Sequence, residues 1–402
     1  MTDLIWTTRP PGAMTEARAA ILAKAIDFAA RVAPRAEETD ALRRLPDATV
    51  ADIKASGLAR IMQPAHFGGD AAPPIAMVDV LLPIAAASGA TAWSLAQYIS
   101  HNYMVARWPE AGQRRVWSET PEALISGILI PRLGNAERVA GGYRLSGRWP
   151  LVTGSNTSDW CMLSAMVTKS GVPHPHYFLV PIAEVTILDT WHAVGLKGSA
   201  SNDVEVRDLF VPDMLVSNDD HLKGGPHAGS ALHPSPIFAL PAFMTFGTLL
   251  TSAVIGMVEA MLAAFLDRDR AGLRSMTGQE IGDQAVSHLK VAEATACLRA
   301  AQALIASDCD DMVAVAESGI APDDARRTGY RSSAAFAGKL ANDAAALLWD
   351  LSGARGVYHP NAIGRAWGDL TVAGRHMTQK WDLNGIEHGR VLRGLPMTNM
   401  SL

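Results

Sequence analysis

Apolar residues recur at helical spacing along the first part of the chain. The segment "MTEARAAILAKAIDFAARVAPRAEETDALRRLP" is rich in Ala and has apolar residues three and four positions apart, which predicts helix. The segment "PDATVADIKASGLARIMQP" predicts another helix, with Gly57 near its end. "DVLLPIAAASGATAWSLAQYISHNYMVARW" is apolar almost throughout, which indicates a buried helix. We therefore expect an N-terminal helical domain over residues 1–118.

The pattern then changes to short runs that are typical of strands. "ISGILIP", "RVAGGYRLSGRWPLVTG", "WCMLSAMVT", "HYFLVPIAEVTIL" and "NDVEVRDLFVP" are separated by Gly, Pro and Asn. The stretch "VAGGYRLSG" predicts a hairpin around Gly141 and Gly142. Residues 119–220 are thus expected to form a small antiparallel β-domain, as a barrel or a sandwich.

Long helical patterns return in residues 235–402, which we expect to form a C-terminal four-helix bundle domain. Gly353 follows one of these patterns as a stop signal. From Gly224 to Val258 there is no charged residue, a length that could span a membrane. Because this segment holds several prolines and runs directly into the charged stretch "MVEAMLAAFLDRDR", we interpret it as a buried helix and expect no membrane association.

Composition narrows the class of protein. The chain has 402 residues, 49% of them hydrophobic and 19% charged, which is typical of a globular protein. The net charge of −5 and the lack of a dense basic stripe argue against nucleic-acid binding. The three cysteines, Cys161, Cys297 and Cys309, have no metal-site spacing, and no signal peptide is visible, so we expect a cytoplasmic protein.

Several common chemical motifs are absent from the sequence. There is no G-x-G-x-x-G between a strand and a helix, no P-loop and no G-x-S-x-G nucleophile elbow. His174 and His176, and the group His221, His227 and His233, lack carboxylate or cysteine partners at ligand spacing. We therefore expect neither a hydrolase nor a metal site, and any use of NAD(P)H would lack the usual glycine turn.

Two turns of the predicted β-domain combine glycine with hydroxyl side chains. They are "GRWPLVTGSNTSDW", from Gly147 to Trp160, and "GLKGSASNDVEVRDLFVP", from Gly195 to Pro212. Such turns expose backbone N–H groups and hydroxyls together, and aromatic faces nearby can cover a flat ring. This is the chemistry that an isoalloxazine ring requires, although ordinary β-turns have the same composition.

These two stretches resemble paired motifs of the acyl-CoA dehydrogenase superfamily, and most closely its flavin-dependent monooxygenases. The stretch "LPDATVADIKASGLARIMQPAHFGG" is similar to the N-terminal helices of the family. "RSMTGQEIGDQ" resembles the Arg-x-x-Phe-Gly segment that meets flavin across a subunit interface, with Thr277 in place of Phe. "LSGARGVY" and "GRAWGDL" resemble the Gly-Gly and Arg-x-x-Arg-Asp motifs, with Gly368 in place of the second Arg.

The resemblance implies a mainly α fold with a central β-domain: an N-terminal helical domain, a middle β-barrel and a C-terminal four-helix bundle. It also implies a homotetramer, with flavin lying between the β-domain and two bundles. The flavin would be reduced by a separate NAD(P)H-flavin reductase and delivered, which agrees with the missing dinucleotide motif.

The fold alone does not separate dehydrogenases from oxygenases. Most dehydrogenases of the superfamily carry their base in a Tyr-Glu-Gly-Thr motif, which this sequence lacks. His376 lies close to where that Glu would fall, and a histidine there resembles the oxygenase branch. An imidazole titrates near neutrality and can remove or hydrogen-bond the proton of a phenol or indole. Glu387 is the rival candidate for the base.

The resemblance also predicts site residues. Thr153 matches the Ser or Thr near flavin N5 and is predicted, with His376, to be catalytic; Ser155 is the fallback for the N5 contact. The apolar helix that carries Trp93 and His101 would face the substrate, together with His376. The predicted cofactor-binding residues are Ser126, Gly127, Trp149, Thr153, Ser155, Lys197, Ser199, Ser201 and Arg274, with Arg274 reaching from a neighbouring subunit.

The sequence thus predicts the oxygenase component of a two-component flavin-dependent monooxygenase. Reduced FAD or FMN, with FADH2 preferred, would react with O2 through a C4a-hydroperoxyflavin and oxygenate a small aromatic or heteroaromatic substrate, indole-like or phenolic. One alternative is an acyl-CoA dehydrogenase-type FAD oxidoreductase or flavin oxidase. A second alternative is a non-catalytic scaffold that keeps the fold.

Overall fold

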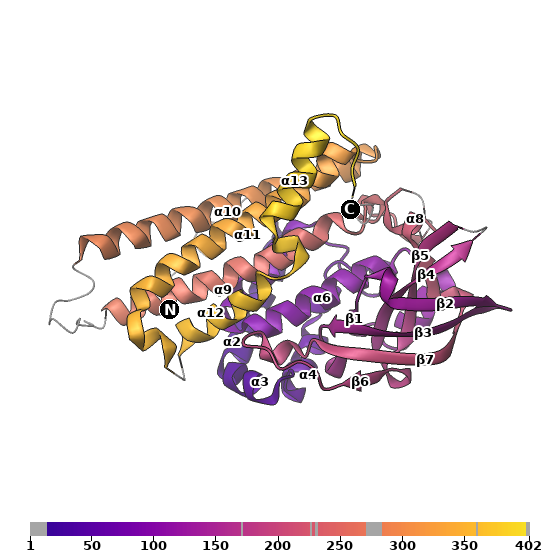
Figure 1. Ribbon diagram of the computed structural model, residues 1–402, viewed down its shortest axis with the longest axis horizontal. Helices are drawn as coiled ribbons and strands as arrows, with labels where there is room; N and C mark the ends of the chain where they lie inside the picture. Colours follow the sequence, from indigo (N-terminus) through magenta and orange to yellow (C-terminus); the bar gives the residue numbers. More distant parts are fainter. Residues whose placement is uncertain are drawn as a thin grey trace.

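In the computed structural model, helices precede and follow a β-sheet along the chain, as the sequence predicts (Figure 1). It describes residues 14–169, 172–225, 227–229, 232–270, 284–358 and 361–398. The helices before the sheet are α2 (Glu16–Val32), α3 (Ala36–Leu42), α4 (Asp47–Ser56), α5 (Ile75–Ala87), α6 (Gly89–Val105) and α7 (Glu110–Trp117). The later helices are α8 (Asp219–Leu222), α9 (Met244–Arg270), α10 (Ala285–Ser318), α11 (Asp324–Ser352), α12 (Ala362–Ala373) and α13 (Trp381–Leu392).

Local chemistry sets the ends of several helices. The Thr15 side chain accepts from the Arg18 N–H and caps α2, and the Asp323 side chain accepts from the Arg326 N–H and caps α11. Gly57 ends α4 with φ 74°, and Gly353 ends α11 with φ 58°, a region that glycine enters without a steric penalty. Both glycine stop signals seen in the sequence are therefore confirmed.

The strands form one sheet in the order β6-β7-β3-β2-β4-β5-β8, with β1 pairing β4 beside that path. Their bounds are β1 (Ile125–Gly127), β2 (Gly134–Val139), β3 (Gly142–Val152), β4 (Trp160–Lys169), β5 (Val172–Pro181), β6 (Thr186–Leu188), β7 (Asn202–Pro212) and β8 (Val216–Asn218). The predicted hairpin is confirmed, since Val139 pairs with Gly142 across an antiparallel β2–β3 ladder. Most ladders are antiparallel, as predicted, but β1 and β2 each pair with β4 in parallel, so the antiparallel expectation holds only in part.

Helices from both ends of the chain share one hydrophobic core. α9 packs against α5, α6, α11 and α12, and all five helices contribute buried hydrophobic residues to one cluster. A second cluster fills the β-domain. The Met244–Arg268 segment is long and apolar enough to span a membrane, yet 78% of its most apolar window is buried inside the protein. It is therefore a buried helix, as the sequence predicts.

Candidate functional site

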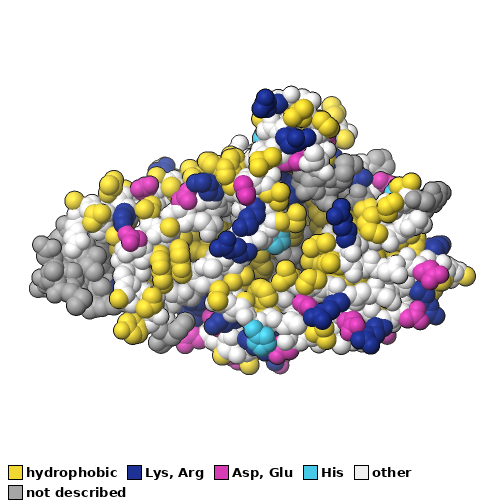
Figure 2. Space-filling model, viewed as in Figure 1, with side chains coloured by type: hydrophobic (Ala, Val, Ile, Leu, Met, Phe, Trp, Pro, Cys, Tyr) yellow, Lys and Arg dark blue, Asp and Glu magenta, His cyan; other side chains and the backbone are white. Residues whose placement is uncertain are grey.

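A cavity of about 470 Å³ opens where the β-domain meets the helices. Figure 2 shows this face hollowed near the middle of the molecule, with hydrophobic side chains around the hollow and a histidine at its edge. The described lining residues contain no Asp or Glu. They are Trp93, Gln97, His101, Gly127, Ile128, Leu129, Ile130, Leu151, Thr153, Trp191, Leu196, Ser201, Phe243, Phe246, Gly247, Arg331, Val372, Arg375, His376, Met377 and Thr378.

One wall of the cavity is a row of side chains on α6. Trp93, Gln97 and His101 follow one another at four-residue spacing, which places them on one face of the helix. Every residue of α6 is buried. Since the rise is 1.5 Å per residue, the row separates Trp93 from His101 by about 12 Å along the axis. The cavity thus extends along about two turns of α6.

Hydroxyl groups cluster at the β-domain wall. Thr153 Oγ1 lies 2.8 Å from Ser201 Oγ, which lies 2.8 Å from Ser199 Oγ. The Gly154 N–H donates to the Ser199 carbonyl at 2.8 Å, so the two glycine-rich turns predicted from the sequence lie against each other. Thr153 and Ser201 both line the cavity and are nearly fully buried.

Backbone strain is concentrated around these hydroxyls. Leu151, Leu196 and Ala200 have positive φ of 61°, 47° and 46°, although none of them is glycine. Each such conformation costs about 1–2 kcal/mol, and surrounding contacts must hold it in place. Strain of this kind gathers at binding sites, and here it lies in the turns that present Thr153 and Ser201.

Gly127 brings the backbone of β1 directly to the cavity. A Cβ at this position would lie 2.7 Å from the Met162 carbonyl oxygen and 3.1 Å from Cε1 of His101. Any larger residue would therefore push the His101 ring out of place. The glycine keeps one side of the ring open to the cavity, as the position of both residues in its lining shows.

His101 is a neutral histidine with its acceptor nitrogen available. Its Nδ1 lies 2.8 Å from the Ile125 carbonyl oxygen, which can only accept, so Nδ1 carries the proton and Nε2 carries the lone pair. Burial lowers the pKa of His101 to about 4. At neutral pH this side chain therefore offers a hydrogen-bond acceptor.

His376 has the opposite tautomer. The Thr378 N–H donates to Nδ1 of His376, which leaves the proton on Nε2. Burial, with a smaller effect of the Arg331 charge, lowers the pKa of His376 to about 4. The ring lies edge-on to Trp93 and Phe246, with centroids 5.8 and 5.7 Å apart. His376 is therefore a fixed hydrogen-bond donor in an aromatic pocket.

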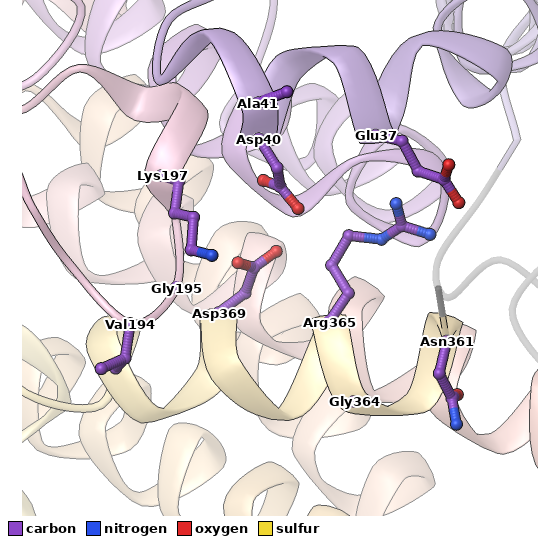
Figure 3. A pocket seen from close by; sticks show the side chains of 10 residues that line it. All are labelled: Glu37, Asp40, Ala41, Val194, Gly195, Lys197, Asn361, Gly364, Arg365 and Asp369. Carbon is purple, nitrogen blue, oxygen red and sulfur yellow. The ribbon is translucent and has the colours of Figure 1, made fainter. Parts of the chain in front are cut away.

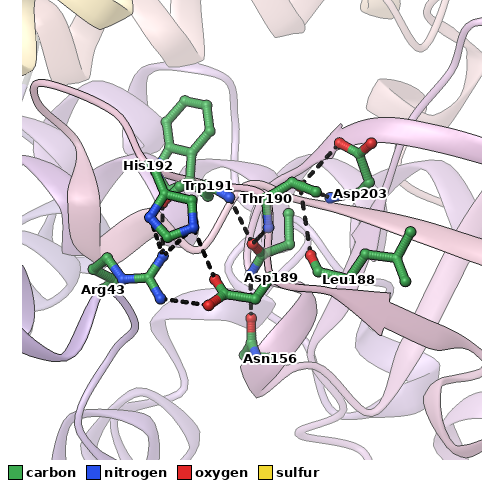
Figure 4. Close-up of polar contacts among 9 residues, drawn as sticks. Arg43, Asn156, Leu188, Asp189, Thr190, Trp191, His192 and Asp203 are labelled. Carbon is green, nitrogen blue, oxygen red and sulfur yellow. Dashed lines mark hydrogen bonds and ion pairs between the residues drawn. The ribbon is translucent and has the colours of Figure 1, made fainter.

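Trp191 completes the wall on a loop that the N-terminal helices hold (Figure 4). Asn202 Oδ1 accepts from the N–H groups of Thr190 and Trp191 at 3.0 and 2.9 Å. Arg43 donates to the Trp191 carbonyl at 3.2 Å and to Asp189 at 2.7 Å. These contacts fix an aromatic face beside the turn that carries Ser201.

The structure brings six of the predicted site residues into this cavity and places the others elsewhere. Those in the cavity are Trp93, His101, Gly127, Thr153, Ser201 and His376. Trp149 lies in the core of the β-domain, where its Nε1 donates to the Ser164 carbonyl at 2.8 Å. Ser126, Ser155 and Ser199 are buried behind the lining; Ser155 Oγ donates to the Ala200 carbonyl. Arg274 lies outside the described residues.

Glu387, the rival candidate base, does not reach the cavity. It is buried, and its carboxylate accepts from the N–H and the hydroxyl of Thr398. Lys197 lines a separate polar cleft of about 440 Å³ between α3, the turn 194–197 and α12 (Figure 3). That cleft also holds Glu37, Asp40, Arg365 and Asp369.

Sequence reasoning missed several lining residues. Gln97 could have been found, because it lies midway between Trp93 and His101 on the same helix face. Trp191, Phe246 and Arg331 gave no signal, since they come from three distant segments that only the folded chain brings together.

The cavity fits a flavin on features of its own geometry. A flat, polar-edged ring needs an apolar slot, a close backbone approach and a few donors at one edge. Trp93, Trp191 and Phe246 supply the slot, Gly127 the close approach, and the Thr153–Ser201 pair the hydroxyl donors. When bound, reduced flavin supplies the two electrons that activate O2. The fold and this cavity define a flavin-dependent oxidoreductase.

Comparison with known proteins agrees with that class. The family models for the N-terminal and C-terminal domains of acyl-CoA dehydrogenase match residues 15–120 and 248–381, which together make up more than half of the chain. The chain therefore belongs to the acyl-CoA dehydrogenase superfamily, and the relatives that it resembles are flavin-dependent monooxygenases.

Individual relatives match almost end to end. The chain is 29% identical to the oxygenase component of the FADH2-dependent resorcinol hydroxylase of Rhizobium sp. (strain MTP-10005), over 96% of this chain and 97% of that one. The crystal structure of 3-HSA hydroxylase from Rhodococcus sp. RHA1 matches with a TM-score of 0.90 at 26% identity, over 95% of this chain and 99% of that one. XiaF from Streptomyces sp., in complex with FADH2 and glycerol, matches with a TM-score of 0.90 at 27% identity, over 96% and 98%.

Proposed function

We propose that this protein is the oxygenase component of a two-component flavin-dependent monooxygenase. It takes reduced flavin, FADH2 or FMNH2, from a separate NAD(P)H-flavin reductase and places one atom of O2 on a small aromatic or heteroaromatic substrate. The observation that carries the proposal is the cavity with two neutral histidines of opposite tautomer beside a buried hydroxyl pair. The resemblance to oxygenase components over nearly the whole chain supports it.

We propose that His101 accepts a hydrogen bond from the acidic O–H or N–H group of the substrate. Its Nε2 accepts a hydrogen bond from a phenol O–H or an indole N–H. With a His101 pKa of about 4 and a phenol pKa of about 10, full transfer before reaction would cost about 8 kcal/mol. His101 therefore polarises the O–H bond and takes the proton only as the ring is oxidised.

His376 and Thr153 are the proposed donors on the flavin side. His376 Nε2–H stays protonated at neutral pH because Nδ1 is held by Thr378. Thr153, whose Oγ1 lies 2.8 Å from Ser201 Oγ, is the proposed hydroxyl contact to flavin N5. Together these donors hold the reacting atoms in place and, with the aromatic lining, exclude water.

The chemistry of a dehydrogenase is not supported by the same cavity. Removal of an α-proton from an acyl-CoA needs a carboxylate base, and none of the described lining residues is Asp or Glu. A non-catalytic scaffold does not require strained turns or histidines held in one tautomer, both of which are typical of a functional site. We therefore place both alternatives behind the monooxygenase.

Assembly and location are parts of the proposal. We infer a homotetramer in the cytoplasm, in which Arg274 reaches the flavin of a neighbouring subunit. Support comes from α13 and the residues after it, where large apolar side chains are exposed: Trp381, Leu383, Ile386, Leu392 and Leu395. Several large apolar side chains exposed on one segment favour a subunit contact there.

A coupling assay tests the proposal. The protein is mixed with chemically reduced FAD or FMN and O2, together with resorcinol, 4-hydroxyphenylacetate or indole, and oxygenated product is counted against flavin oxidised. We expect product with at least one phenol and hydrogen peroxide alone in its absence. Bleaching of bound FAD by an acyl-CoA without any reductase would instead identify a dehydrogenase, and failure to bind either flavin would identify a scaffold.

A further inference from the structure

The turn 195–201 separates the apolar cavity from the polar cleft, and one side chain of the C-terminal helices holds it. Asp369, on α12, accepts a hydrogen bond from the Leu196 N–H at 2.6 Å. Asp369 is only 4% exposed although it lines the polar cleft. Figure 3 shows its carboxyl group and the Lys197 ammonium pointing toward the same part of that cleft.

The segments around the contact between Asp369 and Leu196 are closely packed. A Cβ on Gly195 would lie 2.0 Å from the Gly368 carbonyl oxygen, so the turn lies directly on α12. A Cβ on Gly89 would lie 2.5 Å from Asp369 Oδ2, so the start of α6 closes over the carboxyl group. Three segments from distant parts of the sequence therefore meet at Asp369.

Leu196, the residue that Asp369 holds, has a strained backbone, and the same turn continues to Ser201 of the hydroxyl pair. Leu196 has φ 47°, and four residues later Ala200 has φ 46°. The Leu196 N–H is held by Asp369, and its carbonyl accepts from Trp191 Nε1 at 2.9 Å. Ser199 and Ser201 follow within the same turn, and Ser201 Oγ contacts Thr153 Oγ1. Release of Leu196 would misplace the carbonyl that accepts from Trp191 Nε1 and would loosen the turn that carries Ser201.

We propose that Asp369 is a positioning residue, which clamps Leu196 so that the turn 195–201 holds the Thr153–Ser201 pair and Trp191 against the flavin. The expected release of hydrogen peroxide rests on the proposed function, but the contact between Asp369 and Leu196 does not depend on flavin. Asp369 lines the polar cleft and not the apolar cavity, in which we propose that flavin and substrate bind. Its loss should therefore loosen the wall and release hydrogen peroxide, while flavin still binds.

The test compares Asp369→Leu, which keeps the bulk and loses the acceptor, with Asp369→Asn, whose amide oxygen can still accept from the Leu196 N–H. The matched controls are Glu259→Leu and Glu259→Gln. Glu259, on α9, is also buried, accepts from Gln302, and has its pKa raised by burial to about 7, as Asp369 has, but it does not line the cavity.

The first measurement is amide hydrogen exchange over 195–201 in the flavin-free full-length protein. Leaving a buried N–H without its acceptor changes a population by about ten- to hundredfold, so we expect exchange in Asp369→Leu to rise by that order. Exchange in Asp369→Asn and in both Glu259 variants should stay near the parent value. Equal exchange in Asp369→Leu and the parent would overturn the clamp, whatever the flavin chemistry.

The second measurement is hydrogen peroxide released per reduced flavin oxidised. We expect a several-fold rise in Asp369→Leu, recovery in Asp369→Asn, and little change in flavin affinity. A loosened turn with unchanged peroxide release would refute the positioning role while leaving the proposed function intact. If Asp369→Leu does not fold, Asp369→Ala, which also lacks the acceptor, replaces it in both measurements, and exchange over 195–201 equal to that of the parent would contradict the proposal.

Discussion

The two cavities on either side of the turn 195–201 have similar volumes, about 470 and 440 Å³, and opposite chemistry. The apolar cavity has two neutral histidines and no carboxylate among its described lining residues. The polar cleft has three acidic and two basic side chains. Volume therefore does not identify the reaction site. Burial does, because it lowers the pKa of both histidines to about 4 and so keeps them neutral, while the contacts with Ile125 and Thr378 fix which nitrogen donates and which accepts.

The largest expected effect comes from the acceptor of the apolar cavity. Replacing His101 by Ala removes the group that polarises the substrate, and product per flavin oxidised should fall about a hundredfold. Flavin oxidation should continue, with hydrogen peroxide as its product. His221→Ala is the control, since His221 is half-buried next to Ser217 and does not line the cavity. Full coupling in His101→Ala would remove this residue from the mechanism.

Burial of the two histidines also makes stability depend on pH. Their folded pKa of about 4 lies below the unfolded value of 6.5, so the unfolded state binds more protons between these values. Stability is therefore complete above pH 6.5 and falls as the pH drops toward 4, by about 2 kcal/mol per histidine at pH 5. The raised pKa of Asp369 acts in the opposite direction. Denaturant unfolding of the parent and of His101→Gln isolates one histidine; identical pH profiles would contradict its burial as a neutral group.

A smaller effect is expected from the donor of the cavity. His376→Ala removes one hydrogen-bond donor, and coupling should fall about tenfold. His376→Gln keeps an N–H group and should recover part of the loss. If the Ala and Gln variants are equally coupled and both match the parent, the donor role is wrong.

Replacing Arg331 should change the pKa of His376 without removing its hydrogen-bond donor. Its charge lowers the pKa of His376 in addition to burial, so Arg331→Met should raise that pKa by less than burial lowers it. Titration of the His376 ring by NMR measures the shift. A fall in the pKa would show that Arg331 acts through packing alone.

The polar cleft should respond least. Glu37 is exposed at the edge of the cleft, and Glu37→Gln should change coupling and flavin affinity by less than about twofold. A large loss of coupling in this variant would mean that the polar cleft takes part in the reaction, and the contrast between the two cavities would fail.

Much of the fold could be predicted from the sequence, because its signals are local. Helix periodicity, Gly57, Gly353 and the turn at Gly141 each depend on neighbouring residues. The site could be predicted only in part. The sequence does not show which tryptophan lines the site: Trp149 fills the β-domain core, whereas Trp93 faces the cavity. The tautomers of His101 and His376 depend on Ile125 and Thr378, whose positions only the folded backbone reveals.

The central claim is that the apolar cavity brings reduced flavin, O2 and an aromatic substrate together for oxygenation. The most direct measurement is a single turnover with reduced flavin, a phenol and oxygen gas labelled with oxygen-18, followed by mass spectrometry of the product. We predict one labelled oxygen in each product molecule, and a large loss of labelled product in His101→Ala. Product without label, or labelled product that does not depend on His101, would contradict the account.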